Sequence, residues 1–538
     1  MCRNRCLARL GPFLASVVWL MMAAAFIAGA LWPRPGAAQA TAPATTAGAS
    51  APILFYSDIE SGPSQGGEKD RGAFVSLFGQ GFGATQGQGS VTIGGGSAAA
   101  YPIWSDRRIT LQLGSATRTG DIVVHLAPTG PASNSLPFAV RPGRIFFVSA
   151  TGDDHADGSF KSPWKTLVKA KNTMAAGDIT YAMDGVSQTT EDQYKAALSI
   201  KTDGAFDRPI ALVAYPGATV TVGVPKGLDF GLRIPNVDVS AHFWVISGLT
   251  LRGGQAAIAL GGNGARGWRI IANDMSCPGG DGPAACVETS YATYLKFLGN
   301  DVHDISIDNA ATVSKLYHAI YFSTDSNHIE AAWNHIHHSR ANRAIQFHST
   351  PLDKFCGFNQ YDLLVHDNII HDIRGDAINF ATVDPAQGPV KAYNNLIYHV
   401  GLGPDFRESS SSYAGVYVAG ITNRGQDGKG NVEVYDNTFY DCGARGGGDA
   451  GALSRGEGSL QIMLVARNNI IVAVGKEAYV AASSSPRLIS GSHNLLFGQG
   501  IPPESWRDSS NVDPLFVDPA AGDFRLQRAS PAHGWGGR

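Results

Sequence analysis

Polar residues able to move protons or hold anions recur at fixed offsets in the middle of the chain. They belong to short alternating segments in which a small residue is followed by an apolar one. In three successive segments, the residue before the small one is His318, Arg343 and then Asp376. An imidazole with an unperturbed pKa of about 6.5 can act as a base while a guanidinium holds a carboxylate in a fork. The pattern therefore shows a polar face on the central segments, with groups that suit proton transfer and anion binding.

β-Elimination from a uronic-acid polysaccharide needs a base, a cation that spreads the developing charge, and an acid for the leaving oxygen. We predict that His318 is the base, that Arg343 binds the carboxylate and that Tyr321 is the acid. Lys315 is an alternative cation. The residues predicted to contact the substrate are Lys315, Gln346, His348 and Tyr417.

Three oxygen-bearing side chains of the same columns could hold a calcium ion that neutralises the substrate carboxylate. They are Glu288, Asp376 and Asn379. A simpler interpretation is also open, because Arg343 and Asp376 could form an ion pair between neighbouring segments. Calcium is therefore the candidate cofactor, with this set as its predicted ligands.

A second column of rings follows a repeated asparagine. Its members are His303, His337, His371, Tyr398 and Tyr440. Three histidines in register could bind a transition metal. Rows of like residues also arise when copies of a repeat pack on each other, and we favour this packing interpretation.

The asparagine repeat indicates the elements that position these columns. The asparagines stand at 273, 300, 334, 368, 395, 437, 469 and 494, each with an apolar residue two places later. The mean period of about 32 residues lies in the range of solenoid repeats. Alternating segments without a helical pattern between them predict a right-handed parallel β-helix, in which each strand pairs with its copy one coil further on. Stacked asparagine amides can hydrogen-bond from coil to coil, so we interpret them as structural.

Composition divides the rest of the chain. An arginine-containing start, a long uncharged run and Ala38-Gln-Ala predict a signal peptide over residues 1–40, or an uncleaved anchor. Residues 41–50 have the composition of a linker. Short strands and turns over residues 51–141 predict a small immunoglobulin-like β-sandwich. The β-helix is expected over residues 142–538. The predicted location is the periplasm, the cell surface or the extracellular space.

The predicted sandwich carries specific motifs. They are Gly79-x-Gly-Phe-Gly, Trp104-Ser-Asp, Thr119-Gly-Asp-Ile-Val-Val and Ser133-Asn-Ser-Leu-Pro-Phe. With these motifs the segment resembles an IPT/TIG domain. The resemblance implies a spacer or carbohydrate-proximal module of an exported bacterial protein, and it assigns no catalytic residue.

The remainder also carries motifs, at both of its ends. Phe146-Phe-Val-Ser and Ser162-Pro-Trp-Lys-Thr-Leu open it, and Asn511-Val-Asp-Pro-Leu-Phe closes it. In these respects it is similar to right-handed parallel β-helix proteins of the pectate-lyase-like superfamily. The resemblance implies an acidic polysaccharide as partner and a short helix that caps the open end of the coil. No lysine here matches the catalytic lysine of several superfamily members, which leaves the mechanism open.

Charge and motif content exclude several classes. The formal net charge is −3 and only 16% of residues are charged, so no basic field exists for nucleic acid or an anionic membrane. The sequence has no phosphate-binding glycine loop, Gly-x-Ser-x-Gly elbow or His-Glu-x-x-His motif.

Cys277 and Cys286 flank a loop rich in proline and glycine, and export predicts a disulfide between them. The pairing of Cys356 and Cys442 is open.

These observations predict an exported protein that cleaves an acidic polysaccharide by β-elimination. A uronate epimerase, a glycoside hydrolase and a non-catalytic glycan-binding protein of the cell surface are alternatives on the same scaffold. A hydrolase needs two carboxylates about 5 to 9.5 Å apart, whereas Glu288 and Asp376 are expected about 14 Å apart. Loop carboxylates could supply a pair instead, namely Asp384, Asp405 and Glu408. The oligomeric state and the sugar are left open.

Overall fold

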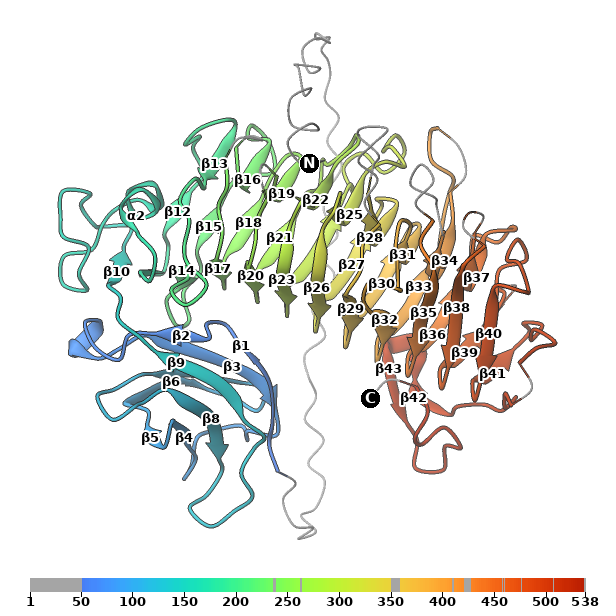
Figure 1. The fold of residues 1–538 in the computed structure, drawn as a ribbon, viewed down its shortest axis with the longest axis horizontal. Helices are drawn as coiled ribbons and strands as arrows, with labels where there is room; N and C mark the ends of the chain where they lie inside the picture. Colours follow the sequence, from blue (N-terminus) through green and yellow to red (C-terminus); the bar gives the residue numbers. More distant parts are fainter. Residues whose placement is uncertain are drawn as a thin grey trace, which may run out of the picture.

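The computed structural model describes residues 51–536 except 236–238, 262–263, 350–358, 409–410, 420–426, 457, 459, 476 and 507. The predicted signal peptide, the predicted linker and Cys356 lie outside the described residues. Three long parallel sheets form a β-helix, and two small sheets precede it as a β-sandwich (Figure 1). The predicted all-β fold, a parallel β-helix behind a small sandwich, is confirmed. No helix among the described residues is long and apolar enough to cross a membrane.

The N-terminal sandwich consists of a four-stranded and a five-stranded sheet whose inner faces share one apolar cluster. The four-stranded sheet has the order β1 (Ile53–Ser57), β3 (Phe74–Gln80), β7 (Arg108–Gln112) and β6 (Ala100–Trp104). The five-stranded sheet has the order β2 (Ser61–Gly62), β9 (Leu136–Val140), β8 (Gly120–His125), β4 (Ser90–Ile93) and β5 (Gly96–Ser97). A 3-10 turn, η2 (Glu68–Asp70), precedes β3. In β4 the valine and the isoleucine are buried, as alternation requires. The IPT/TIG assignment stays a prediction.

The twelve-stranded sheet of the β-helix runs the whole length of the coil. Its strands, in order, are β10 (Ile145–Val148), β11 (Ile179–Ala182), β14 (Ile210–Ala214), β17 (Trp244–Ser247), β20 (Arg269–Ile271), β23 (Thr293–Leu298), β26 (Asn327–Ala332), β29 (Leu363–His366), β32 (Val390–Tyr393), β35 (Gly430–Tyr435), β38 (Ile462–Arg467) and β40 (Ile489–Ser492). The short helix α2 (Leu167–Thr173) lies at its first strands, where the predicted cap was expected (Figure 1).

The other two sheets complete each coil. The eleven-stranded sheet contains β12 (Ser187–Gln188), β15 (Thr221–Val222), β18 (Thr250–Arg252), β21 (Asp274–Ser276), β24 (Asp301–Ile305), β27 (His335–Ser339), β30 (Ile369–Ile373), β33 (Leu396–Val400), β36 (Thr438–Cys442), β39 (Ile470–Ala473) and β41 (Leu495–Gly498). The nine-stranded sheet contains β13 (Ala196–Ser199), β16 (Phe230–Arg233), β19 (Ala256–Leu260), β22 (Ala285–Ser290), β25 (His318–Ser323), β28 (Arg343–His348), β31 (Asp376–Phe380), β34 (Tyr413–Val418) and β37 (Ala450–Arg455).

The repeated asparagines occupy the tight turn between the twelve-stranded and the eleven-stranded sheet. The Nδ2 of Asn300 donates to the Oδ1 of Asn334 at 3.1 Å and to the carbonyl of Ile270 at 2.9 Å. The Nδ2 of Asn334 donates to the Oδ1 of Asn368 at 2.9 Å, and the pattern continues along the coil. Every ladder asparagine is at least 98% buried. The structural interpretation of the asparagines is confirmed, because each amide satisfies groups that would otherwise be buried without partners.

The coil interior is filled by stacked apolar side chains. Ile320, Ile345 and Ile378 lie in register on neighbouring strands of the nine-stranded sheet and are fully buried. Phe347 stacks on a phenylalanine of each neighbouring strand, with ring centroids 5.2 and 5.3 Å apart. Because these inward residues alternate with outward ones, the interior packing fixes which side chains of each strand face solvent.

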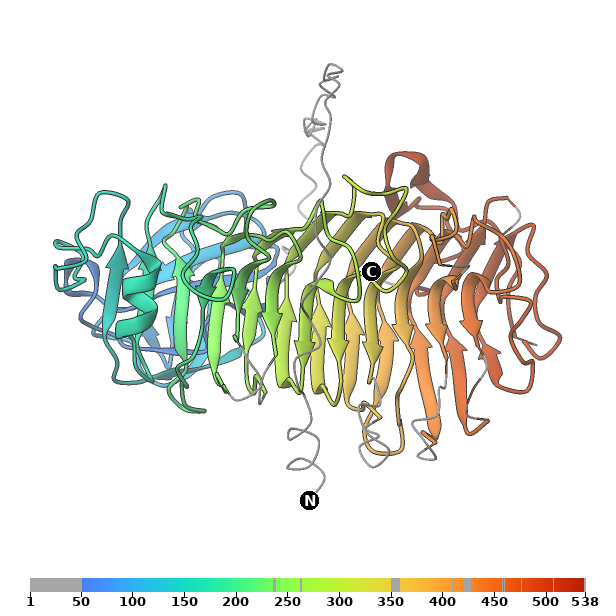
Figure 2. The same cartoon turned by 90° about the horizontal axis from the view of Figure 1, so that it is seen from above.

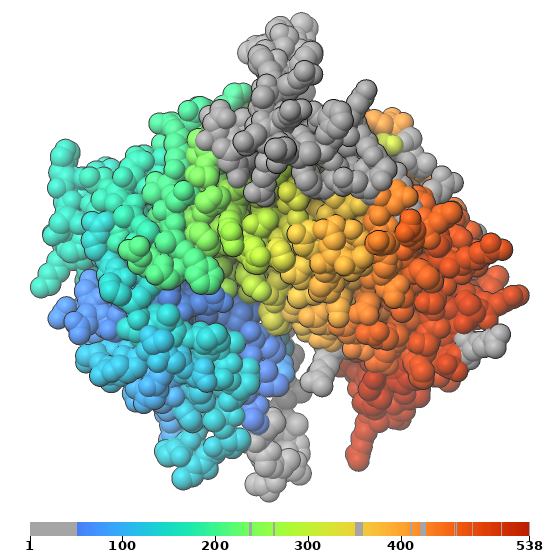
Figure 3. Space-filling model, in the orientation of Figure 1, coloured from blue at the N-terminus to red at the C-terminus, as the bar shows by residue number. Residues whose placement is uncertain are grey.

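The sandwich packs against the outer face of the twelve-stranded sheet (Figure 3). The Tyr181 hydroxyl donates to the carbonyl of Phe74 and accepts from its backbone N–H, both at 2.8 Å. Arg269 donates to the carbonyl of Ser57 at 2.6 Å and pairs with Glu60. The unit that resembles a spacer is therefore docked along the coil.

A hairpin near the end of the chain covers part of the eleven-stranded sheet. It consists of β42 (Phe516–Asp518), the turn η3 (Pro519–Ala521) and β43 (Asp523–Leu526). Phe524 packs on Tyr398 and Tyr440, with ring centroids 4.8 and 5.3 Å apart. The hairpin and the sandwich both lie on the lower side of the coil in Figure 1, away from the nine-stranded sheet, and Figure 2 shows the same coil from above.

Candidate functional site

The predicted columns of polar side chains are registers of the nine-stranded sheet. Ala285 pairs with His318, and Arg343 pairs with Asp376. The second column runs across five consecutive strands as Glu288, Tyr321, Gln346, Asn379 and Tyr417. Neighbouring strands lie about 4.8 Å apart, so successive members of a column are within reach of one substrate.

Asp376 is fully buried and accepts hydrogen bonds from four groups. Its Oδ2 accepts from Arg343 Nε at 3.2 Å, from Asn379 Nδ2 at 2.8 Å and from Ser412 Oγ at 2.6 Å. Its Oδ1 accepts from the backbone N–H of Ala414 at 2.9 Å. A carboxylate has about four lone-pair sites, so Asp376 is occupied in holding its neighbours. The ion-pair interpretation of Arg343 and Asp376 is confirmed.

The predicted calcium ligands are not brought together. Glu288 lies on β22 and Asp376 on β31, with β25 and β28 between them. Three strand spacings are about 14 Å, whereas calcium binds oxygen at about 2.3 to 2.6 Å. Glu288 therefore cannot share an ion with Asp376 and Asn379, and this ligand set is corrected. Calcium as a cofactor stays a prediction.

Arg343 is an oriented cation at the surface of the sheet. Its Nε contacts Asp376, and its Nη1 donates to Gln346 Oε1 at 3.2 Å. The side chain is 18% exposed, whereas its carboxylate partner has no exposure. Because one side of the guanidinium is fixed from below, the other can meet a substrate carboxylate without losing much conformational entropy.

His318 is less suited to the predicted role of base. Only 3% of the residue is exposed, and its Nδ1 has no hydrogen-bond partner among the described residues. Burial, reinforced by Arg343 and His348, holds the pKa of His318 well below its usual range. The ring packs edge-on against Tyr321 with centroids 5.3 Å apart. His318 is thus a neutral ring that supports Tyr321, and a weakly basic one.

Tyr321 and His348 form a hydrogen-bonded pair on neighbouring strands. The Tyr321 hydroxyl lies 3.0 Å from His348 Nδ1. Burial, with a further contribution from Arg343, lowers the pKa of His348 to about 4. His348 is therefore neutral at pH 7, and its Nδ1 can either accept a hydrogen bond from the phenol or donate one to it, depending on the tautomer. This pairing supports a role for Tyr321 in proton transfer.

Glu288 is a carboxyl group of this face with a pKa near neutral pH. Burial raises the pKa of Glu288 to about 7, against the attraction of Arg233. No described residue hydrogen-bonds the Glu288 carboxylate, and the side chain is half-buried. Arg233 lies two strands earlier in the same register, across the small Ala259. A carboxyl with these properties can act as a general acid or base.

The sequence predicted Glu288 as a metal ligand and did not single out Arg233. The missing information was burial, because alternation marks Glu288 only as an outward residue. The long connections that follow the eleven-stranded sheet cannot be placed from a periodic pattern. They include the segment of residues 306–317, which precedes β25.

Two predicted contact residues lie at the edges of this face. Tyr417 is half-buried on β34, next to Asn379, and burial raises its pKa to about 12. Lys315 lies in the connection before β25, where its backbone N–H donates to Glu408 Oε2 at 3.0 Å and its carbonyl accepts from Asn342 Nδ2 at 2.6 Å. Both are therefore within the same region as the central columns.

The loop carboxylates are held in their ionised form. Burial acts to raise the pKa of Glu408, but hydrogen bonds from Lys315, Ser314 and Arg407 lower it to about 2. Hydrogen bonds from Arg445 and Tyr413 lower the pKa of the exposed Asp405. A glycoside hydrolase needs one carboxyl that keeps its proton until it is used, and these two do not supply it.

The third loop carboxylate ties two connections together. Asp384 accepts from Gln387 Nε2 at 2.7 Å and from the backbone N–H of Lys429 at 3.0 Å. These contacts are typical of a residue that caps turns. Asp384 is therefore explained by local structure.

A disulfide lies beside the candidate site. Cys277 and Cys286 are bonded, with their Cα atoms 5.6 Å apart. Cys286 belongs to β22, two residues before Glu288. The bridge thus anchors the loop that leads into the strand of this carboxyl. Cys442 is buried and carries a free thiol.

The second predicted column forms a stack of rings on the eleven-stranded sheet. The centroids of His303 and His337 are 5.5 Å apart, and those of His337 and His371 are 5.2 Å apart. Tyr398 continues the stack at 4.6 Å from His371. The packing interpretation accounts for this stack.

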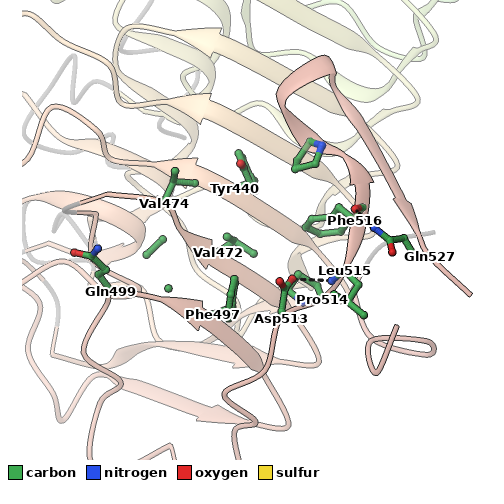
Figure 4. A pocket seen from close by; sticks show the side chains of 13 residues that line it. Tyr440, Val472, Val474, Phe497, Gln499, Asp513, Pro514, Leu515, Phe516 and Gln527 are labelled. Carbon is green, nitrogen blue, oxygen red and sulfur yellow. Dashed lines mark hydrogen bonds between the residues drawn. The ribbon is translucent and has the colours of Figure 1, made fainter. Parts of the chain in front are cut away.

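A cavity of about 410 Å³ lies elsewhere, between the last coils of the eleven-stranded sheet and the C-terminal hairpin. Figure 4 shows its lining, which includes Tyr440, Val472, Phe497 and Phe516. Its carboxylate, Asp513, accepts from the backbone N–H of Leu515 at 2.8 Å. Most of its lining residues are apolar and its carboxylate is bonded to a backbone N–H, so we assign it no chemistry.

No family model and no curated protein matches the chain. Among solved structures, pectate lyase Pel9A is similar at 12% identity and a TM-score of 0.48, over 72% of this chain and 90% of that chain. GH136 lacto-N-biosidase from Eubacterium ramulus is similar at 13% identity and a TM-score of 0.41, over 68% of this chain and 67% of that chain. XylC in complex with xylose is similar at 10% identity and a TM-score of 0.37, over 69% of this chain and 87% of that chain. Likenesses at this level carry no argument about activity.

Proposed function

We propose that the outer face of the nine-stranded sheet binds a polysaccharide that carries carboxylates and cleaves it by β-elimination. The observation that carries the proposal is the convergence of three groups on β22, β25 and β28. Glu288 is a carboxyl with a pKa raised to about 7, Tyr321 is bonded to a neutral imidazole, and Arg343 is oriented by a buried carboxylate. These are the three parts that elimination next to a carboxylate requires.

The mechanism assigns one step to each group. Arg343 binds the substrate carboxylate and spreads the charge that develops on it. Ionised Glu288 removes the proton next to that carboxylate, and the electron pair of the broken C–H bond forms the C=C bond. The C–O bond breaks, and Tyr321 gives its proton to the leaving oxygen. With its own proton on Nδ1, His348 donates a hydrogen bond to the resulting phenolate, and the proton taken by Glu288 is returned to Tyr321 through water.

This assignment moves the base from His318 to Glu288. His318 is almost fully buried and its pKa is held low, so an ionised Glu288 is both better exposed and more basic. A uronate epimerase would share the abstraction step and leave the chain uncut. The loop carboxylates Glu408 and Asp405 have lowered pKa values, so neither of them is the general acid of a hydrolase.

Export and the acidity of the substrate belong to the same proposal. Export is supported by the composition of residues 1–40, and an acidic substrate by the exposed side of Arg343. Calcium remains a proposed cofactor, and the substrate carboxylate would be among its ligands.

To test the proposal, the full chain is incubated with a panel of polysaccharides, once with calcium and once with a chelator instead. Polygalacturonate and alginate are the acidic members, and a neutral glucan is the control. We expect ultraviolet absorbance from the unsaturated uronate product with an acidic member only. Glu288→Gln should lose the signal, whereas Glu433→Gln, an outward carboxylate on β35, should keep it.

Other outcomes would assign the site differently. New reducing ends without ultraviolet absorbance would indicate hydrolysis. Exchange of substrate protons with solvent in an uncut chain would indicate epimerisation. Retention on an acidic polysaccharide with neither change would leave glycan binding as the function. Circular dichroism of each variant separates loss of chemistry from loss of fold.

A further inference from the structure

The eleven-stranded sheet has a group of imidazoles that the proposed function does not use. His335 and His337 lie on β27, and His371 is paired with His337 one strand further on. We call these three residues the histidine cluster. One ring nitrogen of each lies within 4.8 Å of those of the other two. The side chains of His337 and His371 are 15% and 12% exposed, and that of His335 is 43% exposed.

The contacts inside the cluster go beyond the packing of a repeat. The Nε2 atoms of His335 and His371 face each other at 2.8 Å, and packing alone does not require two nitrogens to meet edge to edge. Two nitrogens bound to one tetrahedral zinc ion lie about 3.4 Å apart, for Zn–N bonds of about 2.05 Å. The distance of 2.8 Å between Nε2 of His335 and Nε2 of His371 is shorter than this value, and the upper limit of 4.8 Å for the other nitrogen pairs is longer. Small side-chain movements would therefore bring the nitrogens to the spacing of zinc ligands.

Carboxylates lie around the cluster as outer-shell partners. His371 Nδ1 lies 2.8 Å from Asp372 Oδ2, so a proton on Nδ1 leaves a lone pair on Nε2, which faces His335. Metal-binding histidines almost always donate their other ring nitrogen to such a group. Asp301 Oδ1 lies 3.5 Å from His335 Nδ1, the ring nitrogen that does not face His371. Asp301 therefore has the position of an outer-shell partner of His335.

A second group on the same face competes for Asp301 and is less favourable. It consists of Asp274, Asp301 and His303. Asp274 already forms an ion pair with Arg252, and His303 bonds Asp304 at 2.9 Å. A cation placed there would have to displace the arginine.

We propose that His335, His337 and His371 bind one divalent transition-metal ion of the zinc type on the outer face of the eleven-stranded sheet. Three imidazoles suit zinc, nickel or copper rather than calcium or magnesium. The ion takes the place of the proton shared by the two facing nitrogens. It joins β27 and β30, and it lies on a different sheet from the proposed catalytic groups.

The test measures zinc binding to the full chain, prepared without a polyhistidine tag, by equilibrium dialysis. We expect one equivalent of zinc, with no comparable binding of calcium. His335→Gln and His371→Gln should lose this equivalent. Asp372→Asn should weaken binding by about 10- to 100-fold, as removal of an outer-shell partner does. The matched control is His328→Gln, a histidine paired with Asp362 on the twelve-stranded sheet, which should bind as the wild type does.

A second readout covers loss of fold in the variants. Zinc should raise the Tm of the wild type and of His328→Gln, and it should leave the Tm of His371→Gln unchanged. Glu288→Gln should bind zinc as the wild type does, because Glu288 lies on the other sheet. The zinc site and the proposed catalytic site are therefore tested independently. The absence of a stoichiometric equivalent would overturn this proposal, and so would an equivalent that survives His335→Gln in a folded variant.

Discussion

The nine-stranded and the eleven-stranded sheets belong to the same coil, but the polar side chains on their outer faces differ in how exposed they are. On the nine-stranded sheet, His318 and Asp376 are 3% and 0% exposed, and the pKa of Glu288 is raised to about 7 by burial. On the eleven-stranded sheet, the side chains of His335 and Asp301 are 43% and 45% exposed. One face has polar groups that are almost fully buried, whereas the other has partly exposed pairs of imidazole and carboxylate.

The connections between the sheets also differ. Within the asparagine ladder, the twelve-stranded sheet passes to the eleven-stranded sheet through two residues, as at Gly299 and Asn300. The eleven-stranded sheet passes to the nine-stranded sheet through segments that range from two residues, at 374–375, to twelve residues, at 306–317. Shifted pKa values occur on both faces, because burial raises the pKa of Glu288 to about 7 and lowers that of His335 to about 4.

The largest expected effect comes from the buried carboxylate of the nine-stranded face. Asp376→Ala removes four hydrogen bonds and leaves Arg343 without its buried partner. We expect a loss of about 3 to 5 kcal/mol in the free energy of unfolding, measured by denaturant titration. Asp121→Ala, at an exposed position of β8, is the control and should change stability by less than about 0.5 kcal/mol. A small loss at position 376 would mean that the face is not interlocked in this way.

The pH dependence of cleavage is the next effect in size. Glu288 must be ionised to act as a base, and its pKa is raised to about 7. Activity at limiting substrate should therefore be full at high pH and fall as the pH drops through about 7, by about tenfold per pH unit at the acid end. Initial rates from pH 5 to 9 measure this limb. A limb near pH 4.5 would show that burial does not shift Glu288.

Much of the fold and part of the site could be predicted from the sequence. The asparagine ladder and the alternating segments gave the coil and the register that joins Arg343 to Asp376. The roles of His318 and Glu288 were assigned less well, because the register of a strand does not give the burial that sets the pKa of each side chain. His335 was missed as a member of a cluster, since it lies one residue after the asparagine while the predicted column follows at the third residue.

A smaller effect is expected from the partner of the proposed acid. His348→Gln removes the imidazole that lies 3.0 Å from the Tyr321 hydroxyl. If His348 only positions and stabilises Tyr321, kcat should fall by about tenfold, which is the loss of about one hydrogen bond, and KM should change little. Steady-state kinetics separates these parameters. A rise in KM at constant kcat would instead make His348 a substrate contact, as the sequence predicted.

The smallest expected effect concerns the charge that opposes burial at Glu288. Arg233 lowers the pKa of this carboxyl, so Arg233→Gln should raise it and move the acid limb of activity to higher pH. Near pH 7 the variant should be slower by less than about tenfold, and near pH 9 it should match the wild type. Arg233→Lys keeps the charge and should keep the limb in place. Because Arg233 also donates to the carbonyls of Tyr194 and Pro235, equal slowing of both variants at every pH would assign it a structural role.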